Sequence, residues 1–341
     1  MAKKWVIDMD IFNLINKDGN DCFKDFNEND LQELINRLEE YYLTLRDKLG
    51  LGYETTFGFE IEFEDAMKER IEKRLADYFG QFQEEAWVIA KDLTCGFEVR
   101  TDVLIDNKRN WQDIKEVCKI VNKDAFISSK CGGHIHIGAQ TMGSNLNTWL
   151  NFLKIWSTYE NIIFRFTSGE FLATRPSVIL YAAPLSNTFW EIYNKALQEG
   201  LSVNEIIKTL GKKRNAINFL NVNNLESFDH YNTIEFRCPN ATLNPVIWQN
   251  NLNLFTKLIM RCKSEVDLEL INKRHSELVE NGIPNNLRAY NETINLKQAL
   301  EFCDLIFTNN LDKVYFLKQY LKSFKIRTEP YYKAKKFTRT V

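Results

Sequence analysis

The sequence predicts an α+β fold built around a mainly antiparallel β-sheet. Segments with strand character at residues 56–64, 90–104, 127–139 and 232–240 are dispersed among longer segments with helical spacing. These strands lack the regular strand–helix–strand spacing that predicts a parallel sheet. With 341 residues and 44% hydrophobic content, the chain can bury a substantial core.

The first 50 residues predict an N-terminal extension that carries one amphipathic helix. Apolar residues recur at helical spacing over residues 30–49, Asp30 and Glu33 are placed as a capping box, and Gly50 is a stop signal. We expect a single catalytic domain at residues 51–325. Residues 326–341 form a basic tail, interpreted as a solvated terminus or, alternatively, as a contact for an anionic ligand or membrane surface.

Residues 56–64 give the clearest strand pattern. Apolar side chains at Phe57, Phe59, Ile61 and Phe63 alternate with acidic ones, and a period of two indicates a strand with one packed face. Helical spacing at residues 111–121, 145–165 and 246–271 follows later strands. Residues 295–324 are expected to be helices that close the domain.

Composition excludes several classes of function. The net charge of −2 gives no overall attraction to nucleic acid. Seven widely spaced cysteines without a CxxC pair indicate neither a disulfide framework nor a zinc ribbon. No apolar run approaches the roughly 18 residues of a membrane span. We therefore expect a cytoplasmic protein; its oligomeric state is not readable.

Three strands carry charged or polar pairs spaced two residues apart, which places both members on one face. The pairs are Glu60 with Glu62, His134 with His136, and Glu235 with Arg237. Each alone has an ordinary structural explanation: a solvated edge strand, hydrogen-bonded histidines or a cross-strand ion pair. Together they predict one polar floor on a shared sheet.

Buried carboxylates on such a floor need a cation. Carboxylates outnumber imidazoles and no thiolate has ligand spacing, which favours Mg²⁺ or Mn²⁺ over structural zinc. Mg²⁺ held by few carboxylates keeps positions open for phosphate oxygens, so a nucleotide site is expected. The chain lacks both common glycine-rich phosphate loops, so metal and arginine would have to hold the phosphates.

The ordered segments GFEIEFE, KDLTCGFEV, CGGHIHIG, TRPSVILYAAPL and HYNTIEFRCPNATLNP resemble the amidoligase family, carboxylate–amine ligases related to glutamine synthetase and γ-glutamylcysteine ligase. The resemblance covers residues 56–250. It implies a curved, mainly antiparallel sheet with helices on its convex side and with ATP and divalent ions on its concave face. The implied reaction phosphorylates a small-molecule or peptide carboxylate, and an amine then displaces the phosphate to form an amide.

The resemblance also implies a role for each site residue. The first ion would be held by Glu60, His134 and Glu235, and the second by Glu62, Asp92 and Glu98. His136 would face the nucleotide phosphates. Arg237 would contact the γ-phosphate, and Arg175 would help there or hold a substrate carboxylate. Gly132 and Gly133 are expected to let the backbone pass close to a nucleotide.

Some residues depart from the family pattern. Thr94 stands where a serine is common, and Arg100, Thr101 and Asp102 follow Glu98 where Ser-Pro is common, so the acceptor pocket could differ. Residues 211–225, with Arg214 and Asn218, resemble a family segment near the substrate, but a plain basic loop explains them equally well.

Three other functions stay open at this point. A phosphotransferase acting on a guanidino group would use the same sheet and ions. A hydrolase would use HIHIG as a zinc-binding pair, but only His230 and His275 could complete it. A non-catalytic nucleotide-binding module is the third. The sequence identifies neither the acyl donor nor the amine.

Overall fold

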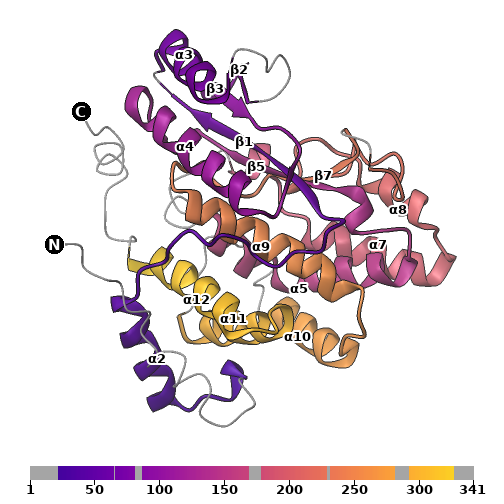
Figure 1. Ribbon diagram of the computed structural model, residues 1–341. Coiled ribbons are helices and arrows are strands. Elements are labelled where there is room, and N and C mark those ends of the chain that lie inside the picture. The colour runs from indigo at the N-terminus through magenta and orange to yellow at the C-terminus, as the bar shows by residue number, and fades with distance from the viewer. Residues whose placement is uncertain are drawn as a thin grey trace.

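The structure is a computed structural model that describes residues 22–64, 66–80, 87–168, 178–228, 231–280 and 292–325. Arg175, His230 and the basic tail at residues 326–341 lie outside these described residues, so predictions about them stay predictions. Helices and strands of the described ranges form the α+β fold that the sequence predicts (Figure 1).

The described strands form one sheet in the order β2-β3-β1-β5-β7-β6, with β4 paired to β1. They are β1 (Thr56–Phe63), β2 (Val88–Asp92), β3 (Gly96–Arg100), β4 (Leu104–Ile105), β5 (Gly133–Gly138), β6 (Ile217–Asn218) and β7 (Thr233–Phe236). Each neighbouring pair is antiparallel. The mainly antiparallel sheet is therefore confirmed. The sheet is uncurled, so the curvature that the resemblance implies is not seen.

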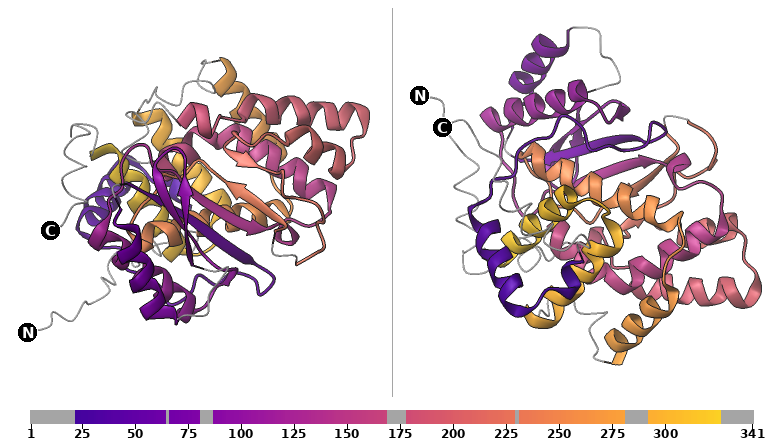
Figure 2. Two further views of the ribbon diagram at one scale, coloured as in Figure 1. Left: turned by 90° about the horizontal axis from the view of Figure 1, so that it is seen from above. Right: turned by 60° about the horizontal axis from the view of Figure 1, so that its bottom comes forward.

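Three long helices, α4 (Lys108–Asp124), α5 (Leu146–Ser168) and α9 (Pro245–Cys262), pack on one face of this sheet (Figures 1 and 2). The other helical elements are η1 (Phe23–Asp25), α2 (Glu28–Glu40), α3 (Lys68–Phe79), η2 (Ala139–Thr141), α6 (Val178–Tyr181), α7 (Ser186–Glu199), α8 (Val203–Leu210), α10 (Leu268–Glu280), α11 (Glu292–Ile306) and α12 (Asn310–Lys325). The expected helix at residues 246–271 thus divides into α9 and α10.

Aromatic side chains join the sheet to these helices. Phe57 stacks on Trp111 of α4, with 5.4 Å between ring centroids, and Phe59 packs on Trp248 of α9 at 5.0 Å. Phe236 stacks on Phe255 of α9 at 4.1 Å. Each fully buried side chain of this size contributes about 1.5–3 kcal/mol. Because strand side chains alternate, the residues between these aromatics must face away from the helices.

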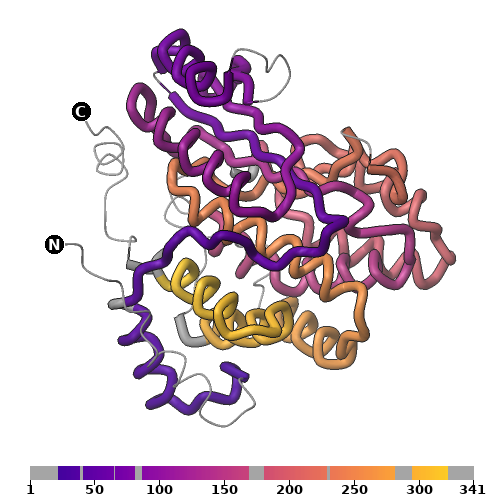
Figure 3. Tube along the Cα trace, viewed as in Figure 1, coloured from indigo at the N-terminus to yellow at the C-terminus, as the bar shows by residue number. Residues whose placement is uncertain are grey.

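The N-terminal helix is shorter than the sequence predicts. α2 ends at Glu40 rather than at residue 49, and its N-cap is Asn27, whose side chain accepts hydrogen bonds from two backbone N–H groups, rather than Asp30. The following segment runs as extended chain across α9 and α12 to β1 (Figure 3). Arg46 explains this course: its backbone N–H and C=O both bond the Gln249 side chain at 2.9 Å, and its guanidinium lies 2.6 Å from Asp312. These tertiary bonds need an extended backbone.

Phe23, Leu34 and Leu38 of the N-terminal segment are buried in the same hydrophobic core as the sheet. The proposed boundaries at residues 50 and 325 stay predictions. No helix in the described ranges is both long and apolar enough to cross a membrane.

Candidate active site

Strand register brings the three predicted pairs onto one face. Glu60 of β1 is directly opposite His134 of β5, and His136 is directly opposite Glu235 of β7. Arg237 follows β7 on the same side as Glu235, and the two side chains form an ion pair. This face is the one that α4, α5 and α9 leave uncovered, so the predicted polar floor is present. We call it the polar face.

His134 lies at the centre of the polar face among three carboxylates. Its Nδ1 is 2.6 Å from Glu60 Oε2 and 3.5 Å from Glu235 Oε1, while its Nε2 is 3.5 Å from Glu62 Oε1. Burial lowers the pKa of His134, but the hydrogen bond to Glu60 and the negative charges of Glu60 and Glu235 together have the larger effect, so the net pKa is raised. When protonated, His134 is an internal counter-ion for these carboxylates.

His136 has a different environment. Its Nδ1 is 3.2 Å from Thr233 Oγ1, whereas its buried Nε2 has no hydrogen-bond partner, although Glu60 Oε1 is only 3.3 Å away. When Nδ1 carries the proton and donates to Thr233, the Nε2 lone pair is free to bind a cation. Ligand atoms of His136, Glu60 and Glu235 all lie within 4.8 Å of one another. This set fits a divalent ion.

Glu235 is held from both sides. Asn218 of β6 donates to its Oε2 at 2.6 Å, and Arg237 pairs with Oε1 and also donates to the Tyr181 carbonyl at 3.3 Å. Burial alone would raise the pKa of Glu235. The charges of His134, His136 and Arg237 together have the larger, opposite effect, so the net pKa is lowered. The carboxylate is therefore ionised at neutral pH, as a metal ligand must be.

Glu60 is also ionised at neutral pH. Burial raises its pKa, but the hydrogen bond from His134 and the proximity of both imidazoles, His134 and His136, together have the larger effect, so the net pKa is lowered. Arg214 lies near the Arg237 end of the polar face, since its guanidinium is over the ring of Tyr181, whose carbonyl accepts from Arg237. The interpretation of residues 211–225 as a segment near the substrate stays a prediction.

A second cluster lies toward the β2 end. Ligand atoms of Glu62, Asp92 and Cys95 are within 4.8 Å of one another. The Gly132 N–H donates to Glu62 Oε2 at 2.5 Å, and one Asp92 oxygen accepts from the Thr94 hydroxyl at 2.5 Å and from two backbone N–H groups. No sequence motif predicted Cys95 as a site residue. The turn between β2 and β3 places its thiol beside Glu62 and Asp92.

Glu98 lies beside this cluster but is bound to Arg100. Its Oε1 accepts from Arg100 Nε at 2.7 Å and lies 2.5 Å from Nη2. Burial and the negative charge of Glu60 raise the pKa of Glu98 to about 7, against the opposing effect of Arg100. Of the other residues that depart from the family pattern, Thr101 accepts a hydrogen bond from the Phe59 N–H at 2.9 Å and so fastens β1 rather than lining a pocket.

Packing against the core explains the glycine at Gly133. A Cβ at this position would lie 2.6 Å from the Asn240 carbonyl oxygen and 2.7 Å from the Trp248 ring. A side chain would therefore not fit. The expectation that Gly132 and Gly133 let the backbone pass close to a nucleotide stays a prediction. Gly132 contributes its N–H to Glu62.

His275, needed by the hydrolase hypothesis, is stacked on Trp190 of α7 with 3.6 Å between centroids. Its buried place in the helical layer gives no support to a zinc site built on His134 and His136.

Residues 83–259, a little over half of the chain, match the family described as "Putative amidoligase enzyme". The chain belongs to this amidoligase family. No curated protein matches it. The family supports an enzyme of the ligase type. The matched range contains Asp92, Glu98, His134, His136, Arg175, Glu235 and Arg237. It begins after β1, so the strand pairing of β1 with β5 and β3, rather than the family match, places Glu60 and Glu62 beside these residues.

Proposed function

We propose that this amidoligase is an ATP-dependent carboxylate–amine ligase with a glutamine-synthetase-like site, acting through an acyl phosphate on a small-molecule or peptide carboxylate. The observation that carries the proposal is the buried Nε2 of His136. This nitrogen has no hydrogen-bond partner and faces the ionised carboxylates of Glu60 and Glu235 beside Arg237. Buried, ionised carboxylates that leave a nitrogen lone pair unused form a natural set of ligands for a cation.

Glu60, His136 and Glu235 would hold a Mg²⁺ or Mn²⁺ ion, which suits oxygen-rich ligand sets. Bound there, the ion would neutralise phosphate oxygens of ATP. We expected His134 to be the ligand and His136 to face the phosphates. The geometry favours the exchanged roles, because His134 Nδ1 is already hydrogen-bonded to Glu60 at 2.6 Å. His134 then positions Glu60 and balances the carboxylate charge.

Arg237 is suited to contact the γ-phosphate. Its Nε and Nη1 atoms are occupied by the Tyr181 carbonyl and by Glu235, which fix the guanidinium plane. The remaining N–H groups can donate to phosphate oxygens, and a fixed guanidinium stabilises charge in the loose transition state of phosphoryl transfer. Without such cations, a carboxylate and a phosphate would repel each other.

In the proposed reaction, a carboxylate oxygen bonds to the γ-phosphorus as the bond from that phosphorus to the β–γ bridging oxygen breaks, and ADP leaves. The amine nitrogen then attacks the acyl carbon. The acyl C–O bond breaks, phosphate departs, and the nitrogen releases a proton to give the amide. The polar face would speed this reaction by holding the substrate carboxylate close to the γ-phosphate of ATP and by restricting the two groups to the reactive orientation.

The proposal is tested by measuring ADP and phosphate release with MgATP against panels of amino acids, small carboxylates, peptides and amines. We expect release to require both a carboxylate and an amine, and to be lost in Glu60→Ala and Arg237→Ala. Turnover that survives both substitutions would refute it. A phosphorylated product formed without phosphate release would instead identify a guanidino phosphotransferase.

A further inference from the structure

Glu160 of α5 is a buried carboxylate that takes no direct part in the proposed reaction. Its side chain is only 2% exposed. Its Oε1 accepts from the Trp156 indole N–H at 2.7 Å and from the Leu185 N–H at 2.6 Å, and its Oε2 accepts from the Ser186 N–H at 2.8 Å. These donors are neutral, and a buried carboxylate is costly unless such donors satisfy it. The position of this carboxylate is therefore closely defined by its partners.

Two of these donors begin α7. Leu185 is the N-cap, which supplies no side-chain cap of its own, and Ser186 is the first residue of the helix. The N–H groups of a helix N-terminus favour a negative charge. A cap from within α7 would stabilise that helix alone. Glu160 belongs to another helix, so it ties the start of α7 to α5, which packs on the sheet.

The segment that precedes α7 reaches the Arg237 end of the polar face. The Tyr181 carbonyl accepts from Arg237 Nε at 3.3 Å, and the Ala183 carbonyl accepts from the Ala216 N–H at 2.8 Å. The Ala216 carbonyl in turn accepts from the Arg237 N–H at 2.8 Å. Residues 182–184 join the Tyr181 carbonyl to the anchored N–H of Leu185. The backbone that holds the guanidinium is thus continuous with the backbone that Glu160 holds.

Trp156 connects Glu160 to β7 itself. Its ring packs on Phe236, with 6.0 Å between ring centroids, and Phe236 directly precedes Arg237. Trp156 also packs on Phe189 of α7 at 6.3 Å. The buried pair of Glu160 and Trp156 therefore supports both the strand that leads to Arg237 and the helix whose preceding segment fixes its guanidinium.

We propose that Glu160 is a positioning residue for Arg237: it fixes residues 181–186 so that the Tyr181 carbonyl holds Arg237 Nε in place. The inference rests on the proposed function only for the use of Arg237 at the γ-phosphate. Glu160 lies on the helix-covered side of the sheet and acts through the backbone, without touching substrate. Its substitution should lower kcat more than it changes KM, because the Arg237 contact is used in the transition state.

Nitrogen-15 NMR of arginine side chains measures this connection without any substrate. The Arg237 Nε–H signal, identified by its loss in Arg237→Lys, should exchange slowly with water in the wild type because a carbonyl holds it. Glu160→Gln keeps the side-chain volume but replaces one acceptor oxygen by an NH₂ group, which cannot accept from Ser186. We expect exchange at least roughly tenfold faster in this variant, kcat lower by a similar factor, and Mn²⁺ affinity unchanged.

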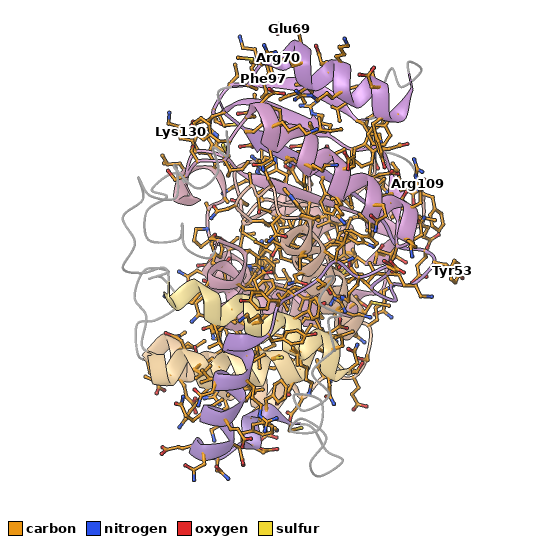
Figure 4. All side chains as sticks on the ribbon, turned by 60° about the vertical axis from the view of Figure 1, so that its left-hand side comes forward. Tyr53, Glu69, Arg70, Phe97, Arg109 and Lys130 are labelled. Carbon is orange, nitrogen blue, oxygen red and sulfur yellow. The ribbon has the colours of Figure 1, made fainter. Side chains whose placement is uncertain are left out.

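Asn107→Ala is the matched control for a simple loss of stability. Asn107 caps α4 by accepting from the Asn110 N–H at 2.8 Å, and α4 packs on β1 rather than on β7 through Trp111 and Phe57. Figure 4 shows Arg109, in the first turn of the same helix, at the surface of the molecule. This variant should unfold more easily, yet keep slow exchange at Arg237 and an unchanged kcat.

Pro184→Gly tests the connecting backbone and serves as the second variant should Glu160→Gln fail to fold by circular dichroism. It leaves Glu160 and its donors in place but gives more freedom to the chain between Leu185 and Tyr181. We expect faster exchange of the Arg237 Nε–H here too, in the same direction as in Glu160→Gln.

Unchanged exchange in both folded variants, Glu160→Gln and Pro184→Gly, would overturn the inference, as would equal acceleration in Asn107→Ala. In an Arg237→Lys background, Glu160→Gln should lower kcat by a smaller factor than in the wild type, because the fixed guanidinium is already absent. Equal factors in the two backgrounds would also overturn it. Because exchange is measured without substrate, faster exchange in the Glu160 variant of a chain that ligates nothing would refute the ligase proposal and support this inference.

Discussion

His136 Nε2 and Glu60 Oε1 lie 3.3 Å apart on the polar face, and the nitrogen makes no hydrogen bond. When Nδ1 carries the proton, the Nε2 lone pair faces an ionised carboxylate, which is unfavourable unless a cation lies between them. This relationship supports our proposal that His136, rather than His134, is a ligand of the first ion.

Substitution of the two histidines should therefore separate their roles. In His136→Ala we expect Mn²⁺ affinity to fall at least roughly tenfold, about 1.4 kcal/mol, because a direct ligand is lost. His134→Gln should retain more of this affinity than His136→Ala, since it keeps the carboxylate ligands and removes only their counter-ion. Electron paramagnetic resonance of free and bound Mn²⁺ measures both. Equal losses in the two variants would contradict the assignment.

Arg237 should contribute to catalysis through the planar shape of its guanidinium as well as through its charge. Arg237→Lys keeps a cation but loses the fork that joins Glu235 and the Tyr181 carbonyl. We expect kcat to fall on the order of 10²–10³-fold, as for removal of a fixed transition-state donor. Arg109→Lys is the matched control, because Arg109 is exposed on α4 and pairs only with Asp113 among the ion pairs of the described residues. A kcat unchanged in Arg237→Lys would argue against a contact with the transferring phosphate.

Gly133→Ala should destabilise the fold. The added methyl group would overlap the Asn240 carbonyl and the fully buried Trp248, so backbone or ring must move. Overpacking of this kind costs about 1–3 kcal/mol, measured as the free energy of unfolding in urea. Gly211→Ala is the control, since its new Cβ would meet the Leu220 side chain at 3.2 Å, where a small adjustment suffices. Comparable stability of the two variants would show that Gly133 is not confined by packing.

His275 should make stability depend on pH. Burial and the nearby charge of Lys154 lower the pKa of His275 from 6.5 to about 4. The unfolded chain therefore binds more protons between these values, so His275 favours the fold fully only above pH 6.5, and this stability is lost as pH falls toward 4. We expect a loss on the order of 1 kcal/mol by about pH 5, after partial solvent screening.

The check compares urea unfolding of the wild type and His275→Gln at about pH 7.5 and about pH 5. The glutamine variant should lose less stability between the two conditions, because it has no imidazole to protonate. An identical pH dependence in both proteins would mean that other groups cause the acid sensitivity.

Much of the polar face was predictable because strand geometry is local. A period of two places Glu60 with Glu62, and His134 with His136, on a common side whatever the rest of the fold does. The α+β class followed from the same patterns. Register between strands depends on distant segments, however, and it decides that His136 meets Glu235 while His134 meets Glu60.

Other features needed the tertiary structure. Cys95 enters the second cluster because the turn after β2 folds back toward β1, which no spacing in the sequence indicates. Helical periodicity continues past Glu40, but Gln249 and Asp312 bind the segment around Arg46 in an extended form. The reason for a glycine at position 133 was also not predictable, because it is a contact with Trp248, more than a hundred positions away.

The acyl phosphate is the central claim, and oxygen transfer tests it most directly. Once the substrate panel identifies a carboxylate that supports turnover, that carboxylate is labelled with ¹⁸O and the released phosphate is analysed by mass spectrometry. The proposed reaction predicts that a labelled oxygen passes from the carboxylate to the phosphate as the amide forms. Amide formation accompanied by unlabelled phosphate would contradict it.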